Sequence, residues 1–143
     1  MKISAKGRYA ISFMLDLAAF NTGEPIPIKD IAKRQDIPEK FLEQIVSDMN
    51  RAGYVKSIRG AQGGYMLRYA PKEYSLDMIL KLTEKNLVPN ELDRKDLSQD
   101  KPGDGVVLRV HDKINHALNQ VLKDITLEDM MEWQQEDWSD YSI

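Results

Sequence analysis

Apolar residues in the N-terminal part of the chain recur three and four positions apart, which is typical of helices with one buried face. The first such segment spans residues 8–20. Ser4 is its predicted N-cap, because a serine hydroxyl can accept a hydrogen bond from a free amide of the first turn. The polar segment 21–25 contains glycine and proline and predicts the end of this helix. A short second helix is predicted over residues 29–34.

A third helix is predicted from Pro38, a residue favoured at the first helical position, to about Ala52, with Gly53 as its stop. Its residues separate into two faces by the helical period. The apolar face consists of Leu42, Ile45, Val46 and Met49. The polar face consists of Lys40, Gln44, Ser47 and Arg51. Such donors suit base edges and phosphates, but they also occur on most exposed helix faces.

Two short extended segments, residues 54–59 and 65–69, predict a β-hairpin whose connection 60–64 reads Gly-Ala-Gln-Gly-Gly. A short helix, a turn, a helix and then a hairpin are the order of elements in a winged helix-turn-helix. Arg59 beside the tip would suit the minor groove of DNA, where the negative potential is enhanced. Gly63 and Gly64 alone would indicate only a tight turn.

A short helix capped by Ser75 is predicted next, with Leu76, Ile79, Leu80 and Leu82 as its apolar set. Residues 84–105 are polar and irregular. A connection of about 20 residues is unusual in a compact domain, so it is either a segment that responds to a ligand or partner or a surface loop.

A long helix is predicted over residues 106–125, with a length of about 30 Å. Its apolar residues are Val107, Val110, Ile114, Ala117, Leu118, Val121, Leu122 and Ile125. One small domain could not easily cover so broad a stripe, so pairing with a second copy is the simplest way to bury it. Packing against the chain's own N-terminal domain is the alternative, and both contacts can coexist.

The C-terminal region begins with a predicted capping box at residues 126–129 and a last short helix through Trp133. The chain ends in an acidic tail whose last residues are Tyr141, Ser142 and Ile143. A partner's pocket could hold this end, although such tails are more often frayed or packed locally.

Charge is distributed unevenly along the chain. The net charge is −3, yet residues 1–70 carry 11 basic against 7 acidic residues, and the remainder carries 9 against 16. Five basic residues and no acidic one lie within residues 49–72, whereas residues 124–143 hold seven acids and no base. The basic stretch is typical of a surface that binds a polyanion, but a solvated surface without a partner would give the same pattern.

Several kinds of chemistry are excluded by composition. With no cysteine, the chain cannot form disulfides, zinc–thiolate sites or cysteine-ligated clusters, and no cofactor is expected. His111 and His116 are five residues apart, roughly 140° around a helix, so they do not form a two-histidine metal site. No motif of nucleophilic catalysis or phosphate binding is recognisable, so no enzyme is predicted. No apolar run approaches a membrane span and no secretory signal is evident, which predicts a cytoplasmic protein.

Three motifs of the chain resemble the Rrf2 family of bacterial transcriptional regulators. They are residues 2–10, which read KISAKGRYA, residues 42–45, which read LEQI, and residues 55–65, which read VKSIRGAQGGY. The resemblance implies a mainly α fold with a small β-wing. It implies a winged helix-turn-helix over residues 1–83, a linker or regulatory loop over 84–105, and a dimerisation helix with an acidic tail over 106–143.

The resemblance also implies which residues contact double-stranded DNA. The third helix enters the major groove, where Gln can pair with adenine and Glu can accept from cytosine. The wing and the start of the first helix add further contacts. With the polar face of the third helix, the expected DNA-binding residues are Lys6, Arg8, Tyr9, Lys40, Glu43, Gln44, Ser47, Arg51, Arg59, Gln62, Gly63, Gly64 and Tyr65. The expected dimerisation residues are Val107, Val110, Ile114, Ala117, Leu118 and Val121.

Family members that bind iron–sulfur clusters place cysteines in the segment that matches residues 84–105, and this chain has none. It is more similar to the cluster-free branch that represses cysteine-metabolism genes. Members of that branch act with cysteine synthase, the O-acetylserine thiol-lyase, which makes Tyr141, Ser142 and Ile143 a candidate docking segment. The alternatives are a regulator of a different set of genes and a winged-helix module that binds protein instead of specific DNA.

Overall fold

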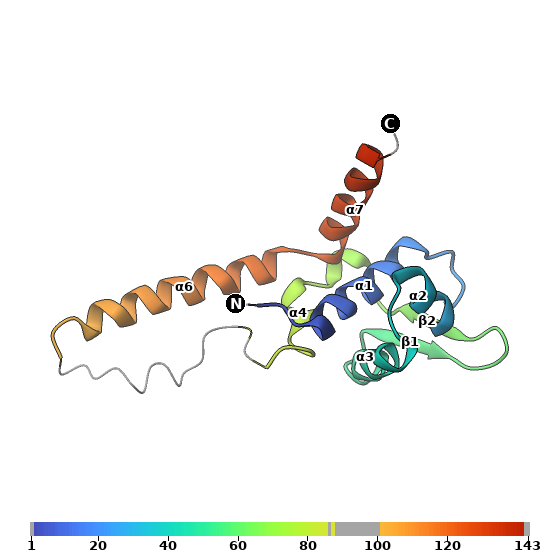
Figure 1. The fold of residues 1–143 in the computed structure, drawn as a ribbon, viewed down its shortest axis with the longest axis horizontal. Coiled ribbons are helices and arrows are strands. Elements are labelled where there is room, and N and C mark those ends of the chain that lie inside the picture. Colours follow the sequence, from blue (N-terminus) through green and yellow to red (C-terminus); the bar gives the residue numbers. More distant parts are fainter. Residues whose placement is uncertain (1, 86, 88–100, 142–143) are drawn as a thin grey trace.

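The computed structural model describes residues 2–85, 87 and 101–141. The elements are α1 (Ala5–Ala19), α2 (Ile28–Gln35), α3 (Glu39–Arg51), β1 (Val55–Ile58), β2 (Gly64–Leu67), the 3-10 helix η1 (Pro71–Glu73), α4 (Leu76–Leu80), α6 (Asp104–Asp124) and α7 (Leu127–Tyr141). The first three helices, the hairpin and α4 form a compact body, from which α6 extends (Figure 1). The fold is thus mainly helical with a two-stranded antiparallel sheet, as the sequence predicts.

Helix α1 is the centre of the body. Ser4 caps it as predicted, because the Ser4 hydroxyl accepts from the Gly7 amide at 3.0 Å. Its inward side chains are fully or almost fully buried: Ala10, Phe13, Met14 and Leu17. The buried face of α3 packs against them with Leu42, Ile45, Val46 and Met49, which confirms the apolar face predicted for that helix.

The turn between α2 and α3 depends on Asp36, which has a left-handed backbone with φ of 52°. The prediction that Pro38 is the first helical residue was wrong by one position, because Pro38 has a non-helical ψ of 130° and α3 begins at Glu39. Gly53 ends the helix region with φ of 79°, as expected for a glycine stop.

The hairpin pairs Val55 with Leu67 and Ile58 with Gly64. A contact that the sequence did not predict joins its second strand to the α1–α2 loop, since Ile26 and Tyr65 exchange two backbone hydrogen bonds of 2.9 Å. Gly64 is required at this crossing, because a Cβ there would lie 2.4 Å from the Ile26 carbonyl group. The base of the hairpin is therefore fixed to the helical body.

The α4 region differs from its prediction in two details. Ser75 precedes the helix, but its hydroxyl donates to the Asp77 carboxylate and makes no capping bond to the backbone. The helix ends at Leu80, so Leu82 lies in the turn that follows. Burial alone would raise the pKa of Asp77, but the hydrogen bond from Ser75 and the nearby Lys81 outweigh it and hold this pKa below its usual value.

The C-terminal helices are longer than predicted. Helix α6 begins at Asp104 instead of Val106, and α7 continues to Tyr141 instead of ending near Trp133. The capping box is present, since the Thr126 amide donates to Asp129 at 2.9 Å and the Asp129 amide to the Thr126 hydroxyl at 3.1 Å. Leu127 and Met130 anchor α7 in the core. None of the described helices is long and apolar enough to cross a bilayer.

Candidate nucleic-acid interface

The outward face of α3 is a polar surface on a rigid support. The helix is held from below by its four buried apolar residues. Its exposed side chains include all five predicted DNA contacts: Lys40, Glu43, Gln44, Ser47 and Arg51. Because the backbone is fixed by the core, these side chains are presented in a defined order along one helix.

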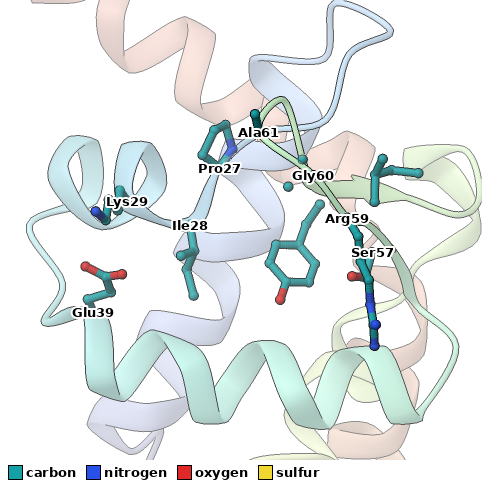
Figure 2. A pocket seen from close by; sticks show the side chains of 12 residues that line it. Pro27, Ile28, Lys29, Glu39, Ser57, Arg59, Gly60 and Ala61 are labelled. Carbon is teal, nitrogen blue, oxygen red and sulfur yellow. The ribbon is translucent and has the colours of Figure 1, made fainter.

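The wing lies beside this helix. Gly60 has φ of 116° at its tip, a backbone that favours glycine, and Arg59 and Gln62 are exposed there. A groove of about 430 Å³ separates the wing from the starts of α2 and α3. Figure 2 shows Lys29 and Glu39 on the helical side of this groove and Arg59 on the wing side.

Three of the predicted wing residues have structural roles that the sequence did not reveal. A Cβ on Gly63 would lie 2.2 Å from the Ile58 carbonyl oxygen, so the connection between the two strands requires glycine there. Gly64 is required by the Ile26 crossing described above. Tyr65 is half-buried and packs against the core. Their assignment to DNA contact stays a prediction.

The start of α1 lies against the flank of α3. Lys6 Nζ donates to Asp48 Oδ2 at 3.1 Å, and the Tyr9 ring meets Phe41 edge to face at a centroid distance of 6.0 Å. Arg8 is exposed. The fold therefore brings the basic N-terminal segment next to the polar face of α3, although Lys6 and Asp48 are 42 positions apart in the sequence.

Two carboxylates that the sequence analysis did not select hold this surface together. Glu84 Oε1 accepts from the Ser4 amide at 2.7 Å and from the Ser4 hydroxyl at 2.9 Å, so it fixes the first turn of α1. Asp16 is buried and accepts from Arg34 at 2.8 and 3.0 Å and from Gln35 at 2.9 Å. No sequence signal could reveal the first contact, because its partners are 80 residues apart.

The Asp16–Arg34 pair sets the position of α2 against α1. The hydrogen bond to Asp16 raises the pKa of Arg34 above its ordinary value. The guanidinium carbon of Arg34 also lies 4.3 Å from the centre of the Phe20 ring. A bidentate pair of this kind specifies orientation as well as distance, so the first helix of the helix-turn-helix is held rigidly.

The predicted dimerisation stripe is exposed on α6. Val107, Val110, Ile114 and Val121 each have about half of their surface accessible in the single chain, at 48%, 51%, 51% and 54%. Ala117 is also exposed and Leu118 is half-buried. Leu122, which follows Val121 by about 100° around the helix, is buried, and α6 as a whole contacts α4. One face of the helix thus packs on the body, and a different apolar face stays uncovered.

The predicted docking segment at the C-terminus is described only in part. Tyr141 is the last residue of α7. Ser142 and Ile143 lie outside the described residues. The same holds for most of the predicted 84–105 linker.

The chain is similar over most of its length to known transcriptional regulators. It is 38% identical over 131 residues to the HTH-type transcriptional regulator CymR of Bacillus subtilis, with 91% of this chain and 89% of that protein covered. It is 40% identical to the HTH-type regulator IscR of Aliivibrio salmonicida over 87 residues, which cover 61% of this chain and 52% of that protein. Among solved structures, that of CymR (YrzC), the global cysteine regulator of B. subtilis, matches with a TM-score of 0.74 at 36% identity, covering 93% of this chain and 98% of that one. T. potens IscR matches with a TM-score of 0.75 at 35% identity, covering 96% and 90%.

A family model described as Rrf2, iron-dependent transcriptional regulator, matches residues 3–133. The residues of this chain do not fit a cysteine-ligated iron centre, because its sequence has no cysteine. Within the part that the structure describes, no group of three or more histidine, aspartate or glutamate side chains is placed to hold a metal ion. Among the described residues, the iron in that description therefore has no recognisable donor set. Motifs, fold and similarity nevertheless agree over the same residues, and the chain belongs to the Rrf2 family of transcriptional regulators.

Proposed function

We propose that this protein binds DNA as a homodimer at an inverted repeat and represses genes of cysteine and sulfur metabolism. The observation that supports DNA recognition most directly is the exposed polar face of α3, supported from below by the core and flanked by the wing and by Lys6 and Arg8. A helix presented in this way fits the major groove of B-DNA. Bound at a promoter, the dimer obstructs transcription sterically.

The side chains of α3 supply base readout. Gln44 can pair with adenine through two hydrogen bonds, and Glu43 can accept from the amino group of cytosine. Lys40, Ser47 and Arg51 add donors for phosphates or base edges. From the wing, Arg59 reaches the adjacent minor groove, where a guanidinium is attracted by the enhanced negative potential.

The uncovered stripe of α6 supports the dimer. Five valine and isoleucine side chains between 48% and 68% exposed form one face of this helix, and a second copy would remove them from water. A symmetric dimer places its recognition helices about 34–36 Å apart, so that two half-sites on one side of the duplex are read together.

The assignment to cysteine metabolism rests on similarity and on the missing cysteines. B. subtilis CymR and T. potens IscR both match over almost the whole chain, so the missing cysteines are what favours the CymR-like branch. With no cysteine in the chain, a cysteine-ligated cluster cannot serve as its signal. We propose instead that the signal reaches this cytoplasmic protein through cysteine synthase, which would bind the C-terminal residues Tyr141, Ser142 and Ile143.

The proposal is tested by selecting fragments of the source genome on the purified protein at physiological salt. We expect enrichment of inverted repeats upstream of sulfur-uptake and cysteine-synthesis genes. Enrichment of inverted repeats beside unrelated genes would support a DNA-binding regulator and contradict its assignment to cysteine metabolism. No enrichment would favour a winged-helix module that binds a protein.

A salt titration distinguishes the two kinds of partner. A protein that contacts six to ten phosphates loses about 10³ to 10⁵ in DNA affinity between 50 and 200 mM salt. Binding to selected fragments should follow this dependence and should prefer the repeat over a shuffled duplex. Equal affinity for both duplexes would contradict specific recognition.

A further inference from the structure

The carboxylate of Asp48 lies between two cations of the proposed DNA-binding surface. Lys6 Nζ donates to Asp48 Oδ2 at 3.1 Å, and Arg51 Nη1 lies 3.7 Å from Asp48 Oδ1. Each oxygen of the carboxylate thus faces one cation. Asp48 shares a single negative charge between α1 and the last turn of α3.

Asp48 borders the recognition face of α3. It follows Gln44 by four residues and precedes Arg51 by three, spacings that make helical neighbours. Its side chain keeps 23% of its surface accessible, while that of Arg51 keeps 77%. A phosphate that approaches Lys6 or Arg51 therefore also meets the charge of Asp48.

We propose that Asp48 acts as an internal counterion of the DNA-binding surface and thereby restrains its affinity for DNA of any sequence. The inference rests on the proposed DNA binding and adds a specificity-determining residue to it. Binding to non-specific DNA depends almost entirely on neutralisation of phosphates. With Asp48 present, Lys6 and Arg51 offer a net charge of one to the phosphates, whereas without it they would offer two.

Specific binding is affected less. Asp48 holds the side chains of Lys6 and Arg51 near one position before DNA binds. These side chains therefore lose less conformational entropy when the DNA binds in the register that places its phosphates beside them. Base contacts from α3 contribute only in that register. Asp48 therefore weakens non-specific complexes more than the complex with the operator.

The test is the variant Asp48→Asn, which keeps the size of the side chain and removes its charge. Affinity is measured between 50 and 200 mM salt for a random-sequence duplex and for a duplex selected from the genome. We expect random-sequence affinity to rise about two- to fivefold, the effect of one exposed ion pair. The plot of log K against log salt should steepen by about 0.9 per protomer, the value for one added neutralised phosphate. Affinity for the selected duplex should change by a smaller factor.

Glu128→Gln is the matched control, because it removes the same charge from the exposed first turn of α7. It should leave affinity and salt dependence unchanged. Thermal unfolding and the size of the dimer verify that both variants keep the fold. Asp48→Ser provides a second neutral side chain should Asp48→Asn be unstable.

A double-mutant cycle with Lys6→Met tests whether Asp48 acts through its contacts. The gain from Asp48→Asn should shrink when Lys6 is absent, whereas additive effects would overturn the proposal. An unchanged salt slope in Asp48→Asn would also overturn it while leaving the DNA-binding function intact. If the unmodified protein bound neither duplex at any salt concentration, the proposed function would itself fail and this inference with it.

Discussion

Single polar side chains connect parts of this domain that are far apart in the sequence. Asp16 joins α1 to α2, and Glu84 fixes the start of α1 from a position after α4. Tyr74 is fully buried, and its hydroxyl accepts from the Arg68 and Tyr69 amides and donates to the Tyr54 carbonyl. These residues contribute position as well as stability, because the elements that they fix carry the proposed DNA contacts.

The substitution Tyr74→Phe should lower the free energy of unfolding by about 1–3 kcal/mol, since it removes the hydrogen bonds of the buried Tyr74 hydroxyl with the Tyr69 amide, the Arg68 amide and the Tyr54 carbonyl. The Arg68 amide keeps a second acceptor, the Tyr54 carbonyl, at 3.2 Å. Urea denaturation measures this loss. Tyr69→Phe is the control, because the Tyr69 ring is 51% exposed and its variant should unfold like the parent. Equal midpoints for the two variants would contradict the role given to the Tyr74 hydroxyl.

Tyr74 should also make the stability of the folded protein depend on pH in the alkaline range. Burial raises the pKa of Tyr74 above its ordinary value of 10.0, although hydrogen bonds from the Tyr69 and Arg68 amides oppose this shift. The folded state therefore holds the phenol proton more tightly than the unfolded chain. This contribution to stability is complete below pH 10 and is lost as the pH rises through the folded pKa, a loss that Tyr74→Phe should not show.

Arg59 in the wing is expected to contribute to operator binding. Arg59→Ala should weaken operator binding by about 1–3 kcal/mol, which is about 5- to 150-fold, while the dimer stays intact. Fluorescence anisotropy with a selected duplex measures the change. Lys123→Ala removes one positive charge from the last turn of α6 and should have little effect. Normal affinity of Arg59→Ala would remove the wing from the mechanism.

At the scale of elements, α3 and α6 each present two faces with different environments. Helix α3 buries its apolar residues and exposes its polar ones, as expected for a surface helix. Helix α6 is different, because only Leu122 is buried while valines and isoleucines remain exposed along much of its length. An apolar face of this kind on a helix that extends from the body indicates an interface.

The variant Ile114→Asp should convert the proposed dimer into a monomer at micromolar concentration, because it places an unpaired charge at the middle of the apolar face. Sedimentation equilibrium measures the change in mass. Asn119→Asp introduces the same charge on the opposite side of α6 and should leave the dimer unchanged. A dimer that survives Ile114→Asp would show that another surface mediates association.

Across the whole molecule, the N-terminal body and the projecting helix α7 differ in charge. The basic residues of the first 70 positions belong to the winged helix-turn-helix, whereas α7 carries acids and no base and projects away from the body (Figure 1). A partner bound at α7 would therefore not need to compete with DNA for the same surface. This arrangement suits a regulator that binds DNA and a second protein at the same time.

Removal of Ile143 should abolish or strongly weaken binding to cysteine synthase if the C-terminal residues are the anchor. Titration calorimetry with the purified enzyme measures this affinity. Binding of a selected DNA duplex should be unchanged, because the deletion does not alter the recognition helix. Unchanged enzyme affinity would exclude the C-terminal residue as the anchor.

The order of elements in the body, the two faces of α3 and the apolar stripe of α6 could all be predicted from the amino-acid sequence. These features depend on local periodicity, capping and turn residues, which can be recognised within a segment of a few helical turns. Thr126 and Asp129 form the predicted capping box for this reason. The same local signals misplaced the ends of α6 and α7, since helix ends depend on packing as well as on caps.

The assembly of the candidate site, in contrast, depends on long-range contacts that form when the chain folds. The contacts of Glu84 with Ser4, of Ile26 with Tyr65 and of Asp48 with Lys6 join residues separated by 39 or more positions. No periodicity encodes such pairs, because each depends on how the helices cross once the core has formed. The sequence thus predicted the cations of the proposed DNA-binding surface, and the packing of α1 against α3 placed a carboxylate between two of them.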